Sequence, residues 1–484
     1  MTAAAAPGAA ARAAAAETER DPRDCPLPPG PSRLTAPKVA LDFFRDPYVS
    51  IPKLARKYGD VVTIPFGVMR TILVSHPDHV HHVLTRHTDR YAHNREGLVR
   101  ADAIVETFSI QGDTPLPALD GPKWKKHRKA MQPHFTGKAL RDVGGLVSEA
   151  LADGVSQWEA FADTGETIDL QDEFGVLAMS TLMRSHFSAA LSRSEVQDWV
   201  HRSHVHGRFV GKAAPTGLLL ERLPWGMAAF RAVPWPHLRG GRRNLDAMCA
   251  TLDRLIENRK ANPQPEHDIL HYLLESTFDD GTSFTHGELR AEMMALMFAG
   301  FDTTAAVLSW TFGLFAANPG PLAQAYAEVD ALGLGAEPVT AAHLERLPYL
   351  RACFDEAQRI QGSLPLNGRW AKQDDVIGGY RIPKGTMVIA SPLGLGMDPR
   401  FWKNPEEFRP RRFLDDEINK NAFIPFGIGP RRCVGVNLAY MEGVLTLATV
   451  LQRYRIEVPP DWKPKRVFTI SNSLESLPAK IWTR

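Results

Sequence analysis

A single cysteine in a short, glycine-rich segment constrains this chain more than any other feature. Cys433 stands near the end of the run Phe426-Gly427-Ile428-Gly429-Pro430-Arg431-Arg432-Cys433-Val434-Gly435, and an apolar helix is predicted to begin at Val436. Glycines allow a backbone to wrap closely around a bound group, and a helix N-terminus stabilises a thiolate. A thiolate presented in this way suits a soft metal, haem iron included. A buried structural cysteine is the alternative.

A long apolar helix is predicted to begin after Thr285. The spacing Thr285-x-x-Glu288 is typical of a capping box, and Asn318-Pro319 ends the helical pattern. The middle of the helix is apolar on every face, so it is expected to be buried. Only nine residues separate Glu292 from Asp302, which is too few to cross a bilayer.

Asp302 and Thr303 interrupt the apolar character of this helix. They follow Ala299-Gly300-Phe301, and an aspartate without a partner is costly to bury. A threonine hydroxyl can donate back to the carbonyl of Ala299, which bends a helix and opens a small groove. Taken alone, the segment also fits a threonine-rich kink without chemistry.

Charged residues in two further segments have spacings that place them on one helical face. Glu356 and Arg359, on a helix predicted to begin near Pro348, can pair, although such pairs are common on surfaces and contribute little there. Trp124 and Arg128 share a face of another predicted helix. That helix also carries Lys123, Lys125, Lys126 and Lys129, with no acid between residues 121 and 132. This basic run predicts either a solvated face or a docking site for an acidic partner.

The composition excludes several classes of protein. The 484 residues carry a net charge of +2 without a long basic arm, which argues against nucleic-acid binding. Four scattered cysteines without a C-x-x-C pair argue against a disulfide framework or a zinc site, and they fit a reducing cytoplasm. Residues 1–30 are interpreted as a disordered Ala/Pro-rich tail rather than a signal peptide or membrane anchor. The folded region is expected to span residues 31–484.

The pattern along the chain predicts a mostly α protein with a small β-rich lobe. Val61–Ile64 and Thr71–Val74 read as two short strands, and residues 120–360 are dominated by helical periodicity. Strand-like segments return between Val376 and Ile389 and again at the C-terminus.

The spacing Phe-x-x-Gly-x-Arg-x-Cys-x-Gly resembles the haem-binding loop of the cytochrome P450 family, with every fixed position filled. The resemblance runs from about residue 30 to residue 484, with the motifs in the family's order. It implies that Cys433 is the axial ligand of haem b, in a loop that includes Phe426 and Gly435. It assigns further roles by position: the haem propionates to Trp124, Arg128, Arg369 and Arg431, the acid–alcohol pair to Asp302 and Thr303, and a buried structural triad to Glu356, Arg359 and Arg412.

The resemblance also implies a fold and a reaction. The fold would be the family's triangular single domain, and the reaction would be insertion of one atom of O2 into an apolar small molecule by hydroxylation or epoxidation. Electrons would come from an external ferredoxin or flavodoxin with its reductase. An apolar insertion at residues 211–241 and the residues Phe298, Ala299, Leu364 and Ile470 predict an apolar pocket. A terpenoid, polyketide or fatty-acyl substrate would suit it.

Two other classes of function remain open at this point. One is a haem-thiolate enzyme that performs oxidative coupling, a rearrangement or a peroxide-driven oxidation. The other is a non-catalytic haem sensor or carrier, which would not need Asp302 and Thr303. The sequence departs from the family in a lengthened stretch at residues 112–120 and in Gly396-Met397, where many members carry His-Arg.

Overall fold

The contacts within the chain group into two compact units, each assembled from separate stretches of sequence. A computed structural model describes residues 21–32, 34–66, 69–94, 107–189, 191–220, 223, 225–233, 239–263, 268–468 and 471–484. Of these, unit 1 takes the described residues within 1–100, 364–407 and 418–433, and unit 2 takes those within 101–363, 408–417 and 434–484. Ile470 and residues 1–20 lie outside the described part. Residues 21–30, which the sequence assigns to a disordered tail, belong to unit 1: Pro22–Asp24 form a helical turn, and the Pro29 carbonyl accepts from the Thr63 amide at 2.8 Å.

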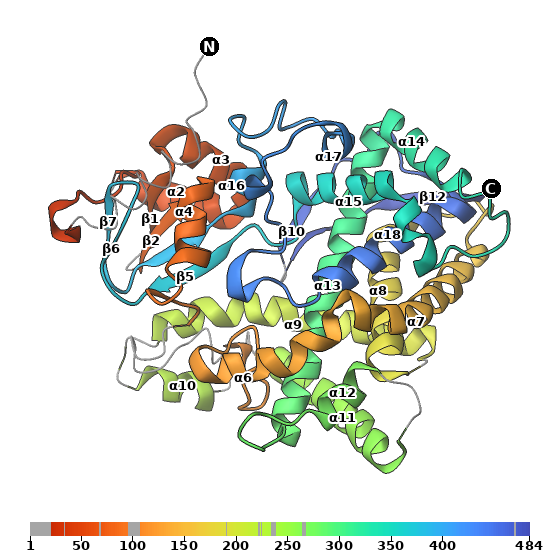
Figure 1. Ribbon diagram of the computed structural model, residues 1–484, viewed down its shortest axis with the longest axis horizontal. Helices are drawn as coiled ribbons and strands as arrows, with labels where there is room; N and C mark the ends of the chain where they lie inside the picture. Colours follow the sequence, from red (N-terminus) through yellow and green to blue (C-terminus); the bar gives the residue numbers. More distant parts are fainter. Residues whose placement is uncertain are drawn as a thin grey trace. The chain divides into compact units, whose positions relative to one another are not determined.

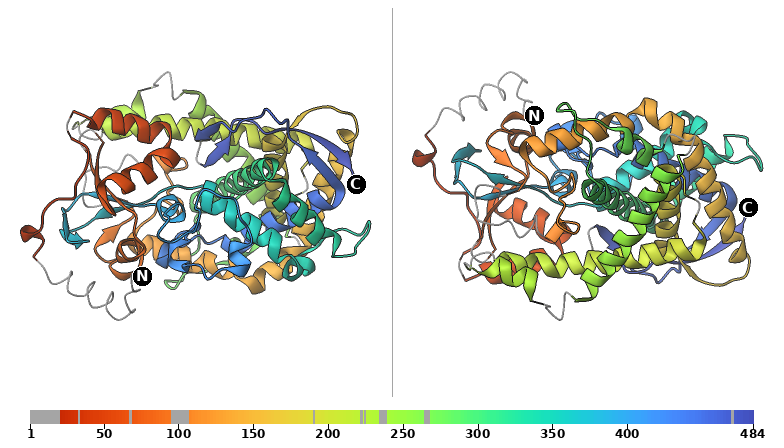
Figure 2. Two further views of the ribbon diagram at one scale, coloured as in Figure 1. Left: turned by 90° about the horizontal axis from the view of Figure 1, so that it is seen from above. Right: turned by 90° about the horizontal axis from the view of Figure 1, so that it is seen from below.

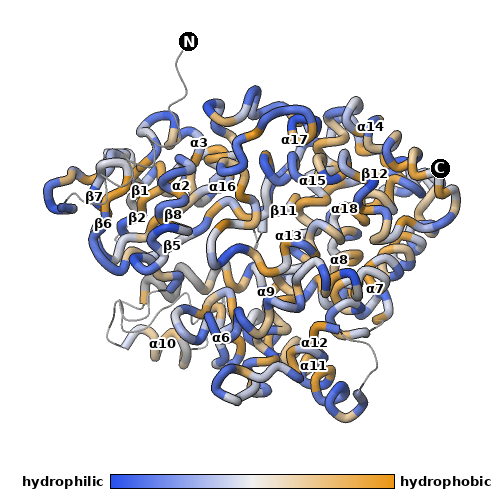
Figure 3. The backbone as a smooth tube through the Cα atoms, in the orientation of Figure 1, coloured by the Kyte–Doolittle hydropathy of each residue, from blue (hydrophilic) through white to orange (hydrophobic). Residues whose placement is uncertain are grey.

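Unit 1 is built on a five-stranded sheet with the order β1-β2-β8-β5-β3. Its strands are β1 (Val61–Phe66), β2 (Met69–Val74), β3 (Tyr91–Ala92), β5 (Asn367–Ala371) and β8 (Met387–Ala390). β2 and β8 run parallel, whereas the other neighbours are antiparallel. β1 and β2 carry apolar, β-branched residues, orange in Figure 3, and Val62, Ile64 and Leu73 are fully buried. The two strands predicted at Val61–Ile64 and Thr71–Val74 are confirmed.

Short helices and a hairpin surround this sheet (Figure 1). Helices α2 and α3 both contact β1, and Asp46 caps α3 by accepting hydrogen bonds from the amides of Tyr48 and Val49. The remaining elements of unit 1 are η1 (Pro22–Asp24), α2 (Ala36–Arg45), α3 (Pro47–Tyr58), α4 (Pro77–His81), the π-helical turn η2 (His82–Arg86), β6 (Asp375–Ile377), β7 (Tyr380–Ile382), α16 (Pro392–Gly396), η6 (Lys420–Ala422) and η7 (Gly429–Arg431).

Unit 2 is dominated by helices, as the sequence predicts. They are α6 (Gly121–Met131), η3 (Gln132–Phe135), α7 (Gly137–Ser156), η4 (Gln157–Ala160), α8 (Leu170–Phe187), α9 (Arg193–Leu220), α10 (Gly226–Ala232), α11 (Arg239–Ala261), α12 (Ile269–Glu275), α13 (His286–Ala317), α14 (Pro319–Asp330), η5 (Ala341–Arg346), α15 (Pro348–Gln361), α17 (Arg412–Asp415) and α18 (Val436–Arg453). Two small antiparallel sheets accompany them, with the strands β4 (Ile168–Asp169), β9 (Tyr454–Glu457), β10 (Arg466–Phe468), β11 (Asn472–Leu474) and β12 (Pro478–Thr483).

Helix α13 forms the core of unit 2. It packs against α8, α11, α15, α18 and β11, and Figure 2 shows it enclosed by other helices of this unit. The capping box at Thr285 and Glu288 is present, and the helix ends at Ala317, just before Asn318. Among the described residues α13 alone is long and apolar enough to cross a membrane, yet 72% of its most apolar window is buried within the protein. It is therefore a core helix, as predicted.

Candidate functional site

The cysteine loop of unit 1 is held by its own backbone. The amide of Cys433 donates to the carbonyl of Phe426 at 3.0 Å, which closes the segment into a tight loop around η7. Gly427 and Gly429 have φ angles of 67° and 75°, a conformation that strongly favours glycine. The thiol of Cys433 is exposed, and helix α18 starts three residues later at Val436, where the sequence predicts it.

The loop leans on the π-helical turn η2. A β-carbon added at Gly429 would stand 2.1 Å from the carbonyl oxygen of Leu84, so only glycine allows this approach. Behind η2, the buried Asp375 carboxylate accepts from Tyr91 and Arg90 and lies 2.7 Å from His82 Nε2. Burial acts to raise the pKa of Asp375, but these partners outweigh it and hold the pKa at about 2. A charged and fully hydrogen-bonded aspartate therefore anchors the turn on which the loop rests.

The other predicted residues of unit 1 occupy different elements. Arg369 lies on β5, where Nη1 donates to the Gly368 carbonyl at 2.7 Å and lies 3.3 Å from His93 Nδ1. Arg431 lies in η7, and both arginines are half-buried. Phe426 is half-buried, whereas Leu364 is exposed. Unit 1 therefore contributes two half-buried arginines and the loop that carries Cys433.

In unit 2, α6 places Trp124 and Arg128 on one face, as their spacing predicts. Asp120 caps the start of the helix by accepting from the amide of Gly121. Trp124 and Arg128 are half-buried, and Arg128 Nε donates to Gln132 Oε1 at 3.0 Å.

The basic face of α6 is partly neutralised by acids from a distant segment. Lys126 Nζ lies 3.0 Å from Asp280, and Lys129 Nζ lies 2.6 Å from Asp279. Lys123 and Lys125 are exposed on the same helix. The sequence shows no acid near these lysines because their partners lie about 150 residues further along the chain.

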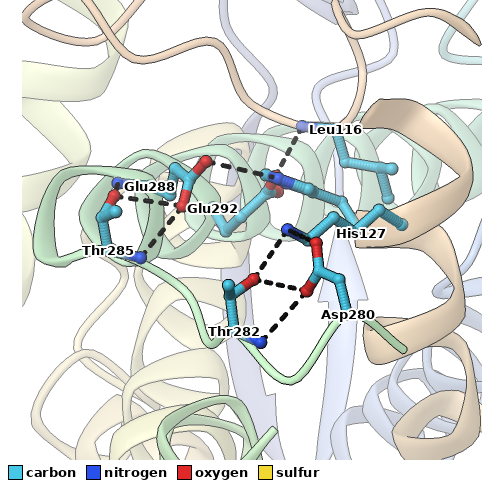
Figure 4. Close-up of polar contacts among 8 residues, drawn as sticks. Leu116, His127, Asp280, Thr282, Thr285, Glu288 and Glu292 are labelled. Carbon is cyan, nitrogen blue, oxygen red and sulfur yellow. Dashed lines mark hydrogen bonds and ion pairs between the residues drawn. The ribbon is translucent and has the colours of Figure 1, made fainter. Parts of the chain in front are cut away.

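A buried acid–base contact joins α6 to α13 (Figure 4). His127 Nδ1 lies 2.7 Å from Glu292 Oε1, and the same oxygen accepts from the Leu116 amide at 2.9 Å. Burial raises the pKa of Glu292, although His127 counteracts it. Sequence reasoning assigned no role to either residue. The sequence does place Glu292 at the edge of the apolar part of α13, which indicates a glutamate that needs a buried partner. The identity of that partner, His127, follows only from the fold.

Asp302 and Thr303 lie side by side on α13 in different surroundings. Thr303 Oγ1 donates to the Ala299 carbonyl at 2.6 Å, as predicted. The helix remains continuous there. Ala299 is exposed and Thr303 half-buried, whereas Phe298 and Asp302 are buried. One face of the long apolar helix is therefore accessible to solvent at Ala299 and Thr303.

The three residues of the predicted triad meet in unit 2. Glu356 accepts from Arg359 Nε at 2.7 Å and from Arg412 Nε at 2.9 Å. The backbone amide of Arg409 donates to the same carboxylate at 2.9 Å. All three side chains are buried. The Glu356–Arg359 ion pair is therefore not one of the exposed pairs that contribute little to stability.

The donor set fits haem better than a bare metal ion. Among the described residues, no group of three His, Cys, Asp or Glu side chains could hold a metal ion. The four cysteines all lie in the described part of the chain, and none of them forms a disulfide. A metal bound through a single cysteine needs a chelating cofactor to fill its other positions. The half-buried arginines can pair with that cofactor's carboxylates.

Comparisons with known proteins agree with this donor set. The family model described as Cytochrome P450 matches residues 26–481. Cytochrome P450 132 of Mycobacterium bovis is 30% identical over 414 residues, which cover 84% of this chain and 86% of the relative. Cyclooctat-9-en-7-ol 5-monooxygenase of Streptomyces melanosporofaciens is 27% identical, over 83% and 84% of the two chains. The crystal structure of the cytochrome P450DA heme domain has a TM-score of 0.80 at 24% identity, covering 95% of this chain and 98% of that one.

Proposed function

This chain belongs to the cytochrome P450 family and is a haem-thiolate monooxygenase; we propose that it hydroxylates or epoxidises an apolar terpenoid. Polyketides and fatty-acyl compounds are the alternative substrates. The relative that acts on cyclooctat-9-en-7-ol supports the terpenoid class. Ala299 on α13 presents apolar surface one turn before Thr303, with Phe298 buried beside it, which suits a hydrocarbon skeleton. Leu364 and Ile470 complete the proposed set of pocket residues.

Each predicted residue has a part in this proposal. Cys433 supplies the thiolate, with Phe426 and Gly435 in the loop around it, and Trp124, Arg128, Arg369 and Arg431 hold the two propionates. When bound, haem with a thiolate ligand supplies the activation of O2. Asp302 and Thr303 hold and deliver protons, and Glu356, Arg359 and Arg412 keep the fold rigid.

The half-buried Thr303 hydroxyl beside the buried Asp302 supports an oxygen-activating enzyme over a haem carrier. Because the hydroxyl hydrogen is donated to a carbonyl of its own helix, the oxygen is left as an acceptor for an incoming proton donor. A buried carboxylate stands next to it. A carrier would need neither group.

An external redox partner, a ferredoxin or flavodoxin with its reductase, is proposed to deliver electrons. The exposed Lys123 and Lys125 on α6 would attract an acidic carrier, although the pairing of Lys126 and Lys129 reduces this attraction. A reducing cytoplasm is the proposed location, since none of the four cysteines is in a disulfide.

Two measurements test the proposal. Reduced wild-type protein with CO should give the red-shifted Soret band of a haem thiolate, and Cys433→Ser should lose it; an unchanged band would mean that another residue holds the iron. Turnover with a surrogate ferredoxin and its reductase should then yield an oxygenated product of cyclooctat-9-en-7-ol, with laurate as the control. Oxygenation of laurate alone would replace the terpenoid class with a fatty-acyl one.

A further inference from the structure

His204 faces Asp302 from a neighbouring helix of unit 2. Its Nε2 atom on α9 lies 3.9 Å from Asp302 Oδ1 on α13. Its ring centre lies 5.9 Å from that of Phe301, the residue before Asp302. A small rotation of either side chain, or one bridging water, closes a gap of this length. The His204 imidazole is therefore close enough to the Asp302 carboxylate to pass a proton to it, directly or through one water.

Exposure increases from Asp302 through His204 to a third acid–base group on α8. The side chain of Asp302 is 5% exposed and that of His204 is 24% exposed, whereas Asp172 is exposed. The charges of Asp302 and Asp172 act to raise the pKa of His204, but burial, the largest cause, lowers it, and so do Arg208 and His201. The net result is a pKa below the ordinary value of 6.5, so the imidazole exchanges protons readily in weak acid.

We propose that His204 is the residue that supplies protons to Asp302 from solvent, an inference that rests on the proposed function. The Nε2–H bond of the imidazolium breaks as an O–H bond forms at Asp302 Oδ1. The neutral imidazole then takes a proton from solvent, so no electron is gained or lost. In this proposal His204 acts on the reaction through Asp302 alone.

The competing interpretation is that His204 only balances the buried charge of Asp302. Two substitutions separate the interpretations. His204→Phe removes both the charge and the exchangeable proton. His204→Lys keeps a cation opposite Asp302 but does not release its proton between about pH 5.5 and 8, because the pKa of lysine is about 10.4.

Turnover is measured as NADPH oxidation and product formation from cyclooctat-9-en-7-ol with the surrogate ferredoxin system. In wild type the rate should rise as the pH falls toward about 5.5, because more of the imidazole carries a proton. Both variants should lose this rise and turn over roughly tenfold more slowly, with a larger solvent deuterium isotope effect. A His204→Lys variant that turns over at the wild-type low-pH rate across the whole pH range, without a rise, would leave only the charge-balancing role.

His201→Phe is the matched control, because it makes the same change at an exposed position of α9. It should keep the wild-type rate, with the rise at equal or slightly higher pH, since a cation that lowers the pKa of His204 is removed. A loss equal to that of His204→Phe would indicate damage to the helix and overturn the relay.

A spectroscopic readout is independent of turnover. The NMR titration of the His204 ring, identified by its absence in His204→Phe, should show a lower pKa in Asp302→Asn, because a charge that raises the pKa is lost. An unchanged pKa would overturn the contact. Absence of the thiolate CO band in wild type would overturn the proposed function itself, whereas a normal band with a wild-type pH profile in His204→Phe overturns the relay alone.

Discussion

Arg412 Nε donates to Glu356 Oε1 at 2.9 Å although the two residues lie 56 positions apart in the sequence. Both side chains are at most 1% exposed. Arg359 donates to the same carboxylate from within α15. Glu356 is the anion that both buried guanidinium groups share, so its removal leaves two buried cations without compensation.

Glu356→Ala should therefore yield misfolded or haem-free protein rather than a folded, inactive enzyme. An uncompensated buried charge costs about 3–5 kcal/mol, which is a large share of the stability of a typical domain. Urea unfolding and the ratio of haem to protein measure the effect. Arg411→Ala is the control, because Arg411 pairs with Asp415 on the exposed side of α17 and its loss should cost less than about 1 kcal/mol. A stable, haem-loaded Glu356→Ala protein would remove the structural role.

Arg128→Ala should weaken haem retention much more than Lys125→Ala. Arg128 is half-buried on the face that carries Trp124, whereas Lys125 is exposed, so only Arg128 is placed to neutralise a shielded carboxylate. The rate of haem transfer to apomyoglobin measures retention for both variants. Equal rates would mean that this face of α6 does not bind the cofactor.

Local signals in the sequence predicted α13 well, because each end is set by adjacent residues. Thr285 and Glu288 close the capping box, and Asn318-Pro319 stops the helix. The contact of His127 with Glu292 could not be predicted in the same way, since 165 positions separate the two residues. The acid partners of Lys126 and Lys129 escaped prediction for the same reason. The spacing of residues along a helix predicts which side chains share a face of that helix, but it does not predict which other segment packs on that face.

Burial of Glu442 on α18 should give the protein a specific pH dependence of stability. The side chain is 1% exposed, and burial raises its pKa well above 4.5, with a hydrogen bond to Thr304 acting in the opposite direction. The folded state therefore holds a proton that the unfolded state releases as the pH rises above about 4.5. Glu442 consequently makes folding less favourable with rising pH, by up to about 1.4 kcal/mol per pH unit until its folded-state pKa is passed.

Glu442→Gln removes this dependence because an amide of the same shape does not ionise. The free energy of unfolding of the variant minus that of wild type should increase between about pH 5 and pH 8, as measured by urea titration at each pH. Glu345→Gln, at an exposed position of η5, should give a flat difference. A flat difference for Glu442→Gln as well would show that the buried carboxyl ionises normally.

Thr303→Ala tests the chemistry of α13 most directly. If the Thr303 oxygen positions the proton donor, its loss should leave folding, haem content and substrate binding intact. NADPH consumption should continue while product falls and hydrogen peroxide rises, because protons arrive without the right placement. Peroxide and product yields per NADPH, measured with the surrogate ferredoxin system, give the coupling.

Two variants on the same helix sharpen that test. Thr311→Ala removes an equivalent hydrogen bond, from Thr311 Oγ1 to the Val307 carbonyl at 2.7 Å, at a fully buried position. It should reduce stability and leave coupling unchanged. Thr303→Ser keeps the hydroxyl and should restore most of the product. If Thr303→Ala retains wild-type coupling, the hydroxyl has no part in proton delivery, and a non-hydroxylating reaction of the same haem-thiolate fold becomes the better hypothesis.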